Sequence, residues 1–343
     1  MASTPDNTPP TLVRWYMDTR PLTTHTSTLP LLSTLQPTEQ EAIQKFYHLK
    51  DKHMSLASNL LKYLFIHRTC HIPWNQISIS RTPAPHKRPC FIPSPALLST
   101  LSAPIPTVEF NVSHQNSLVA LAGTTIPTPA SQFTTTAATT APPDPTTNPH
   151  PTIPQVGIDI TCVNERHGKR GPEPRTRASF LEYATIFSEV FSARELSLIQ
   201  SLTHPSGKYP LTSLEGVEYS YRVFFTYWAL KEAYIKMTGE ALLAPWLREL
   251  EFTDVIAPDA GENAYRGVKT SLYGTEVQDV RLEVVAFEED YLVATAARGG
   301  KIGAARAGDG CDGEKGDVWE GLVRIDIEED VRPCAMGECR CLV

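Results

Sequence analysis

Residues 108–123, VEFNVSHQNSLVALAG, decide the fold because two apolar strands flank a Gln-Asn-Ser turn, a pattern that predicts a β-hairpin. Residues 282–297, LEVVAFEEDYLVATAA, predict a second hairpin, and the two stretches align without gaps at an offset of 174 positions. The matching positions are Glu109, Leu118, Val119, Ala120 and Ala122 in the first stretch and Glu283, Leu292, Val293, Ala294 and Ala296 in the second. This repeat suggests two related halves.

Both halves also share the order of helix, then hairpin. The ranges that carry these signals are 12–18 (strand), 39–67 (helix) and 75–80 (strand) in the first half, and 155–160 (strand), 176–202 and 217–239 (helices) in the second. The sequence therefore predicts an α+β fold, a pseudo-dimer of two similar α/β halves. We expect the active site in the cleft between the halves, where pockets are common.

Two segments of biased composition separate the patterned regions. Residues 124–155 are mostly Thr and Pro, which predicts an extended linker, and residues 298–317 are rich in Gly. The expected divisions are a flexible N-terminus (1–11), an N-terminal half (12–123), the linker (124–155), a C-terminal half (156–297) and a Gly-rich segment with a C-terminal tail (298–343).

Composition narrows the class of protein. The 343 residues are 41% hydrophobic and 20% charged, as in globular proteins, and the net charge of −7 argues against a general nucleic-acid binder. No apolar run is long enough for a membrane span, and the N-terminus lacks a secretion signal. Seven cysteines, an odd number scattered along the chain, do not indicate a disulfide framework, so we expect a cytoplasmic protein. From the charge and the apolar runs we expect no nucleic-acid or membrane partner.

Three of these cysteines lie close together near the C-terminus, in CAMGECRC (334–341). A structural zinc site usually needs two pairs of ligands at regular spacing, and the sequence shows no second pair. We therefore expect Cys334, Cys339 and Cys341 to belong to a loose, reduced tail.

Two motifs carry acids in apolar surroundings. In WALKEAYIK (228–236), Glu232 and Lys236 share one helix face, although such a pair alone is typical of a solvated surface. In VGIDI (156–160), Asp159 interrupts a buried-type strand. A buried carboxylate needs a cation, a metal or a position at the strand end, and capping of the following turn is the simpler alternative.

Two further motifs carry groups suited to phosphate. FNVSH (110–114) offers Ser113 and His114 at a hairpin, where a simple polar turn is the alternative. SRTPAPHKRPC (80–90) concentrates basic groups among prolines, which suits a polyanion or a solvated loop. Because Mg²⁺ is often shared between one or two carboxylates and substrate phosphates, the combination points to phosphate-ester or pyrophosphate chemistry.

FNVSH, VGIDI and WALKEAYIK resemble, in order and form, the three signature motifs of the surfactin-type 4′-phosphopantetheinyl transferases. Residues 49–62, 72–82 and 86–91 are similar to that family's coenzyme A-binding segments, and the resemblance covers residues 12–297 apart from the linker. It implies a pseudo-dimer with coenzyme A and Mg²⁺ in the cleft.

The resemblance also implies roles for individual residues. Asp159 and Glu232 would bind Mg²⁺ on the coenzyme A pyrophosphate, and Lys236 would contact phosphate. Ser113 and His114 would bind the nucleotide's phosphates. The implied catalytic residues are Glu232, Lys236, Asp159 and His114. The residues implied to grip the 3′-phosphate end are Lys50, Arg81, Lys87 and Arg88.

The implied reaction transfers phosphopantetheine to a serine of an apo acyl or peptidyl carrier protein and releases adenosine 3′,5′-bisphosphate. Glu232, or a water on the metal beside it, would accept the serine proton. The carriers of fatty-acid, polyketide and nonribosomal-peptide synthesis and aminoadipate reductase are all candidates, with carrier contact near FSARELSLIQ (191–200). The alternatives are a Mg²⁺-dependent coenzyme A hydrolase and a non-catalytic binding module, and we expect a monomer.

The sequence departs from the family pattern in three places. Thr161 stands where many relatives carry an acid, so a water could complete the metal site. The spacer between the last two motifs is long, with insertions expected at 164–177 and 203–216. The Thr/Pro linker is a further insertion, typical of a eukaryotic or fungal member. VRIDIEED (323–330) imitates the strand motif with Asp326, Glu328 and Glu329, but it follows the helix motif, and a solvated charge run is the favoured interpretation.

Overall fold

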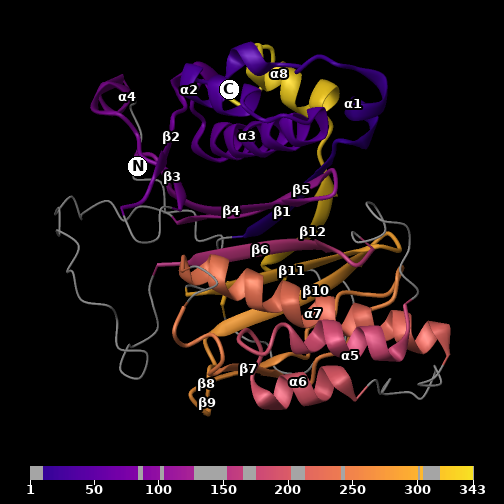
Figure 1. The fold of residues 1–343 in the computed structure, drawn as a ribbon. Coiled ribbons are helices and arrows are strands. Elements are labelled where there is room, and N and C mark those ends of the chain that lie inside the picture. The colour runs from indigo at the N-terminus through magenta and orange to yellow at the C-terminus, as the bar shows by residue number, and fades with distance from the viewer. Residues whose placement is uncertain are drawn as a thin grey trace.

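A computed structural model describes residues 11–83, 88–100, 104–126, 153–164, 175–201, 213–240, 244–299, 302–303 and 317–342. Its two halves stack so that a helix, two sheets and a second helix form successive layers (Figure 1). α3 (Leu49–Cys70) and α7 (Leu214–Thr238) are the helices of these two layers. None of the described helices combines the length and apolar character that crossing a bilayer requires.

The N-terminal half is built on a four-stranded sheet of order β12-β1-β5-β4. Its strands are β1 (Leu12–Asp18), β4 (Thr107–Gln115), β5 (Leu118–Ile126) and β12 (Trp319–Arg324). Asn116 and Ser117 form the two-residue turn of the β4–β5 hairpin, both with positive φ, at 46° and 76°. The remaining elements are α1 (Arg20–His25), η1 (Leu32–Thr34), α2 (Pro37–Gln44), η2 (Trp74–Gln76), β2 (Ile79–Arg81), β3 (Pro89–Phe91) and α4 (Pro95–Thr100).

The C-terminal half is built on β6 (Gln155–Cys162), β10 (Val280–Phe287) and β11 (Tyr291–Arg298), in the order β10-β11-β6. The long helix α7 packs on β6, and Gly157 permits this approach because a Cβ at that position would overlap the backbone of Ala233 and Met237. The smaller elements are α5 (Arg177–Thr185), α6 (Ala193–Gln200), β7 (Leu250–Thr253), β8 (Lys269–Leu272) and β9 (Thr275–Glu276).

The two halves repeat one topology, as the paired hairpins predict. In each half the first strand pairs antiparallel with the second strand of the hairpin, β1 with β5 and β6 with β11. The ungapped alignment, however, is wrong for one strand of the pair. Glu109 pairs with Thr124, whereas Glu283 pairs with Thr295 and not with Arg298, the counterpart of Thr124 at that offset. The reason is that the second hairpin has a longer loop and a different register.

The helical run expected over residues 39–67 is divided in two. α2 ends at Gln44 and α3 begins at Leu49. The side chains of Phe46 and Tyr47 between them are 44% and 91% exposed, so this stretch has no apolar face to continue one helix along the core.

The expectation of a loose C-terminal tail is wrong. β12 pairs parallel with β1, and the chain continues into η4 (Ile327–Val331) and α8 (Arg332–Ala335). Ile325, Ile327 and Val331 are buried in the same core cluster as the apolar face of α3. Because these side chains remove apolar surface from water, the segment after the Gly-rich stretch is an ordered part of the N-terminal half.

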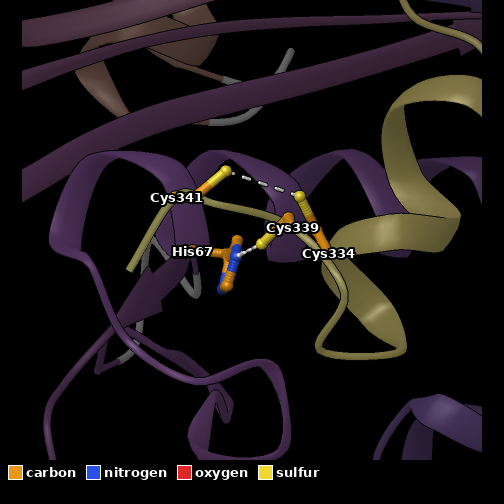
Figure 2. A group of neighbouring side chains, drawn as sticks. All are labelled: His67, Cys334, Cys339 and Cys341. Carbon is orange, nitrogen blue, oxygen red and sulfur yellow. Dashed lines mark hydrogen bonds between the residues drawn. The ribbon is translucent and has the colours of Figure 1, made fainter. Parts of the chain in front are cut away.

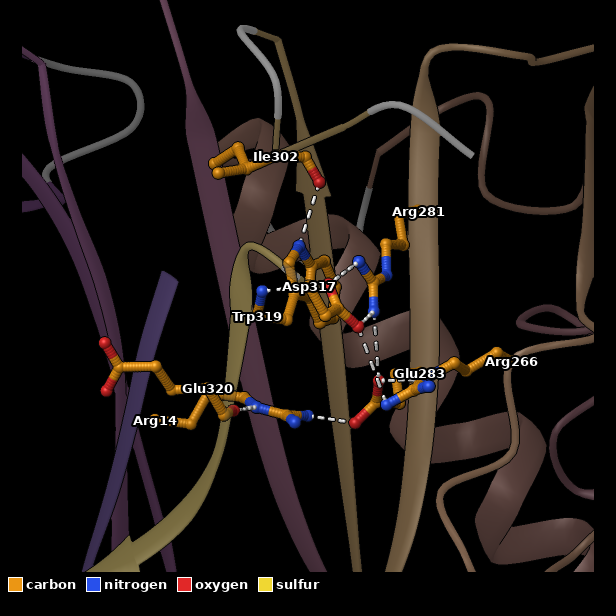
Figure 3. A network of polar contacts seen from close by, with 8 residues as sticks. All are labelled: Arg14, Arg266, Arg281, Glu283, Ile302, Asp317, Trp319 and Glu320. Atoms are coloured by element: carbon orange, nitrogen blue, oxygen red, sulfur yellow. Dashed lines mark hydrogen bonds and ion pairs between the residues drawn. The ribbon is translucent and has the colours of Figure 1, made fainter. Parts of the chain in front are cut away.

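A polar network connects the sheets of the two halves (Figure 3). Arg14 on β1 forms a buried ion pair with Glu283 on β10, and Arg266 donates to the other carboxylate oxygen at 2.8 Å. Burial alone raises the pKa of Glu283, but Arg14 and Arg266 outweigh it, and the net shift is downward. Arg281 donates two hydrogen bonds to Asp317, at 2.7 and 2.8 Å. The buried carboxylate is thus compensated from both halves.

Candidate functional site

The candidate site lies where β4 of the N-terminal half meets β6 of the C-terminal half. Side-chain amides of β4 accept hydrogen bonds from the backbone of β6: Ile158 donates to Asn111 at 3.3 Å, and Cys162 donates to Gln115 at 2.6 Å. The partners advance together along both strands, so β4 and β6 run side by side in the same direction. The FNVSH motif therefore lies against the VGIDI motif.

Asp159 is the centre at which three motifs converge. Its Oδ1 accepts hydrogen bonds from Ser113 Oγ at 3.0 Å and Lys236 Nζ at 2.5 Å, and its Oδ2 accepts from Thr161 Oγ1 at 2.7 Å. Lys236 also donates to Ser113 at 2.8 Å. β4, β6 and α7 thus each supply one member of a compact cluster, and Thr161 supports the carboxylate of Asp159 with a hydrogen bond.

Glu232 lies one turn before Lys236 on α7 and is half-buried. Desolvation raises its pKa, the negative charge of Asp159 raises it further, and Lys236 opposes both effects. Among the described residues, no hydrogen bond or ion pair to Glu232 is found. One lysine is therefore the positive charge beside two carboxylates, so the cluster keeps an excess of negative charge. Carboxylate oxygens in such a setting are suitable ligands for a divalent cation such as Mg²⁺.

Two basic side chains of the N-terminal half, His114 and Lys62, are close enough to interact electrostatically. His114 is exposed on β4, and its pKa is lowered by desolvation, then by Lys236, with a smaller contribution from Lys62 of α3. Burial lowers the pKa of Lys62 to about 8; Glu39 opposes the shift and Arg81 adds to it. Sequence reasoning missed Lys62, although it ends the segment 49–62 and its helix position was the available signal.

The other residues of the expected phosphate grip have different surroundings. Lys50 donates to Asn116 Oδ1 at 2.5 Å, at the turn of the β4–β5 hairpin. Arg88 is paired with Glu109 and also donates to the carbonyl of Val156 at 3.2 Å, so part of its guanidinium is engaged between the halves. Lys87, which was expected beside it, lies outside the described residues.

The acids of residues 323–330 stand apart from this cluster. Asp326 accepts hydrogen bonds from the backbone of Glu328 and Glu329 at 2.8 and 3.2 Å, as the cap of η4. Glu328 pairs with Arg332 one turn later. These acids therefore stabilise a local helical segment over the N-terminal half.

Comparison with known proteins identifies the family. Residues 21–126 match the family model described as 4′-phosphopantetheinyl transferase, N-terminal, and residues 155–296 match the 4′-phosphopantetheinyl transferase superfamily. Together these matches span both halves on either side of the linker. The chain belongs to the 4′-phosphopantetheinyl transferase family, as its motifs predict.

Fungal members are among its similar relatives. The chain is 57% identical over 357 residues to 4′-phosphopantetheinyl transferase A of Aspergillus fumigatus, with 99% of each chain covered. It is 54% identical over 353 residues to 4′-phosphopantetheinyl transferase NpgA of Emericella nidulans, covering 98% of this chain and 97% of the relative. A human relative, L-aminoadipate-semialdehyde dehydrogenase-phosphopantetheinyl transferase, is 28% identical over 268 residues, covering 77% of this chain and 67% of the human protein. The expectation of a fungal-type transferase is confirmed.

Proposed function

We propose that Asp159, Glu232, Lys236, Ser113 and His114 form the active site of this phosphopantetheinyl transferase, at the junction of its two halves. The observation that carries the proposal is the direct contact of three motifs, in which Asp159 accepts from both Ser113 and Lys236. Enzymes of this class move 4′-phosphopantetheine from coenzyme A to a carrier-protein serine. The cluster offers acids for a metal and donors for phosphate within one small region.

Asp159 and Glu232 are the residues that would hold Mg²⁺. These residues suit the metal because two carboxylates lie beside one lysine. Glu232 also has no hydrogen bond to the described residues, so its oxygens are available as ligands. A bound Mg²⁺ would neutralise the charge that develops on the pyrophosphate. Thr161 donates to Asp159 and brings no negative charge, so these two acids are the protein ligands we assign.

Lys236, Ser113 and His114 would bind and orient the substrate. Among the described residues Lys236 Nζ has two partners, which leaves a third donor for a phosphate oxygen. Ser113 can turn its hydroxyl from Asp159 to a phosphate when a cation takes over the carboxylate. Neutral His114 retains one N–H donor. Positioned donors of this kind hold a transferring group in line with its acceptor.

Glu232 is the group we assign to accept the proton of the attacking serine. It is a half-buried carboxylate beside the cluster with no hydrogen bond among the described residues, whereas Asp159 accepts three hydrogen bonds that hold its carboxylate in place. Lys50, Lys62 and Arg81, with Lys87 outside the described residues, would bind the 3′-phosphate end of coenzyme A through their positive charge.

The partners of this transferase are coenzyme A and carrier proteins. We propose that the carriers include those of fatty-acid, polyketide and nonribosomal-peptide synthesis and aminoadipate reductase, since the human relative is named for aminoadipate-semialdehyde dehydrogenase. The exposed face of α6, with Arg194 and Leu198, is the proposed carrier contact. We further propose a cytoplasmic monomer in which the internal repeat takes the place of a second subunit.

The test is to incubate the chain with coenzyme A, Mg²⁺ and a panel of apo carriers and to measure intact carrier mass. Transfer adds the phosphopantetheine mass to the carrier, whereas a hydrolase would consume coenzyme A without that addition and a binding module would do neither. Asp159→Ala and Glu232→Ala should abolish the addition. Lys269→Ala, which removes an exposed charge from β8, should not. Normal transfer by either acid variant would overturn the site assignment.

A further inference from the structure

Four metal-binding side chains meet where the C-terminal segment crosses α3, in a region that the transferase site does not use. They are His67, Cys334, Cys339 and Cys341, and their ligand atoms all lie within 4.8 Å of one another (Figure 2). Cys334 Sγ and Cys341 Sγ are 3.7 Å apart, and His67 Nε2 lies 3.1 Å from Cys339 Sγ. His67 and Cys334 are buried and the other two cysteines are half-buried.

We propose that His67, Cys334, Cys339 and Cys341 bind one Zn²⁺ ion in a Cys₃His site that fastens the C-terminal segment to α3. Tetrahedral Zn²⁺ with Zn–S bonds of ~2.3 Å places two sulfurs roughly 3.8 Å apart. The 3.7 Å between Cys334 and Cys341 has this spacing. The more distant atoms need to draw in by only about 1 Å to complete the tetrahedron. Four soft or borderline ligands favour zinc over Mg²⁺.

The orientation of His67 supports a metal ligand. Its Nδ1 lies 2.7 Å from the carbonyl oxygen of Ile72, and a carbonyl can only accept a hydrogen bond. The proton is therefore assigned to Nδ1, which leaves the lone pair of Nε2 directed at the cysteines. Zinc-binding histidines commonly have such a hydrogen bond from the second ring nitrogen, because it fixes the ring and its tautomer.

The charge of the site is also compensated. Three thiolates, one neutral imidazole and Zn²⁺ carry a net charge of −1. The guanidinium of Arg68, the next residue on α3, lies beside Cys334 and supplies a positive charge. A disulfide between Cys334 and Cys341 would involve only two of the four groups. It would not explain why His67 and Cys339 lie beside them. The metal engages all four.

The proposed ion connects parts of the chain that are remote in sequence. His67 and Cys339 are 272 positions apart, so the ion would close a loop around most of the protein. The segment that it holds contains η4 and α8, whose apolar side chains complete the core over α3. Loss of the ion is therefore expected to lower the melting temperature and to expose residues 325–342 to proteases.

The experiment measures metal content in the full-length chain, purified without a metal-binding tag. We expect about one zinc per chain, and at least roughly tenfold less in Cys339→Ser and Cys341→Ser. Two matched controls should keep the ion: Cys90→Ser, a half-buried cysteine on β3, and Asp159→Ala, which removes an acid of the transferase site. Zinc that survives both cysteine substitutions, or that is lost with Asp159, would overturn the proposal.

A second measurement does not depend on the folding of variants. The wild-type chain is stripped with a chelator, reduced and reconstituted with Co²⁺. A Cys₃His site gives thiolate-to-cobalt charge-transfer absorption and strong visible bands of tetrahedral Co²⁺, which one equivalent of Zn²⁺ removes. Absence of these bands in the refolded chain, or a native chain whose mass shows a disulfide between two of the three cysteines, contradicts the site. Transferase activity is then assayed with excess Mg²⁺, so that removal of Mg²⁺ by the chelator is not mistaken for an effect of zinc loss.

Discussion

Two lysines on α7 are five residues apart, and each pairs with a carboxylate, but their surroundings differ. Lys231 is fully buried; it pairs with Glu195 at 2.9 Å and donates to the carbonyl oxygens of Leu247, at 3.0 Å, and Leu250. Burial lowers the pKa of Lys231 and raises that of Glu195. The side chain of Lys236 is 27% exposed, and its partners within the described part of the chain are Asp159 and Ser113.

The difference separates a structural ion pair from one available to a ligand. All three donors of Lys231 are used, and Glu195 also accepts from the backbone of Phe252 and Ser192 at 2.8 and 3.0 Å. Nothing in that pair is left for a substrate. The Lys236 pair keeps a free donor, solvent access and a second acid nearby. A lysine and a carboxylate therefore stabilise the fold in the Lys231–Glu195 pair. In the Lys236–Asp159 pair they are positioned to bind a ligand.

The largest expected effect is that of Asp159→Ala on phosphopantetheine transfer. Transfer should fall below detection because both metal binding and the position of Lys236 depend on this carboxylate. Stability should fall less than on loss of one partner from a fully buried ion pair, since the partly exposed Lys236 can turn to solvent. Quenched transfer assays and urea unfolding measure the two quantities. Asp254→Ala, at an exposed ion pair with Lys269, is the control. A variant that unfolds would place Asp159 with Glu195 among structural acids.

Lys231→Met gives the next largest effect, and it acts on stability. The change leaves Glu195 buried without its cation, which costs about 3–5 kcal/mol of the free energy of unfolding. Adding Glu195→Gln removes the orphaned charge and keeps an acceptor for Phe252, so the double variant should recover part of the loss. Urea unfolding of the wild type, the two single variants and the double variant gives the coupling energy. A cost below about 1 kcal/mol would show that the pair is solvated like a surface one.

The position of Lys231 shows what the sequence could not predict. Helical geometry places Lys231 about 100° from Glu232, so Lys231 is expected to affect coenzyme A binding less than Lys236 does. The geometry of one helix does not show that Lys231 is buried and that Glu195, on another helix, is its partner. The same limit explains why the sequence did not predict the proposed zinc ligand set, whose histidine is far from its cysteines in sequence. Contacts between distant segments leave no local pattern in the chain.

Local patterns predicted the strand and the helix that carry the other residues of the proposed site. The strand around Asp159 and the four-residue spacing of Glu232 and Lys236 are properties of short segments, and the structure confirms both elements. The hairpin repeat predicted the two-half architecture for the same reason. It failed on the register of one strand, which depends on loop length, and on β12, whose pairing with β1 crosses almost the whole chain.

Lys236→Met should weaken binding of coenzyme A by about 1.5–3 kcal/mol, the range of a charge-assisted hydrogen bond. This is roughly ten- to hundredfold in Kd. Methionine keeps the aliphatic stem, so helix packing is retained. Lys269→Met is the matched control, because it removes the same charge from an exposed position of the same half. Isothermal titration in the presence of Mg²⁺ measures the affinity of both variants for coenzyme A. Equal affinities would show that Lys236 is purely structural.

The smallest expected effect tests a third lysine, Lys62, which is half-buried and has no ion pair within the described residues. Burial lowers its pKa to about 8, so the free enzyme loses this positive charge above that pH. If Lys62 binds phosphate, binding requires the protonated amine. Affinity for adenosine 3′,5′-bisphosphate, which lacks the thiol of coenzyme A, should then be constant near pH 7. Above about pH 8 it should fall, by at most about tenfold per pH unit.

The stability of the free enzyme should respond in the opposite direction. Between pH 8 and the ordinary lysine value of about 10.4, the unfolded chain binds more protons at Lys62 than the native chain does, so this residue adds stability as pH rises. Lys62→Arg keeps its charge at every pH in this range and should remove the decline in affinity, whereas Lys62→Met should bind weakly throughout. Affinity that falls equally in wild type and Lys62→Arg would assign the titration to another group. A pH-independent wild type would place Lys62 outside the phosphate site, leaving Lys236 as the lysine that responds to ligand.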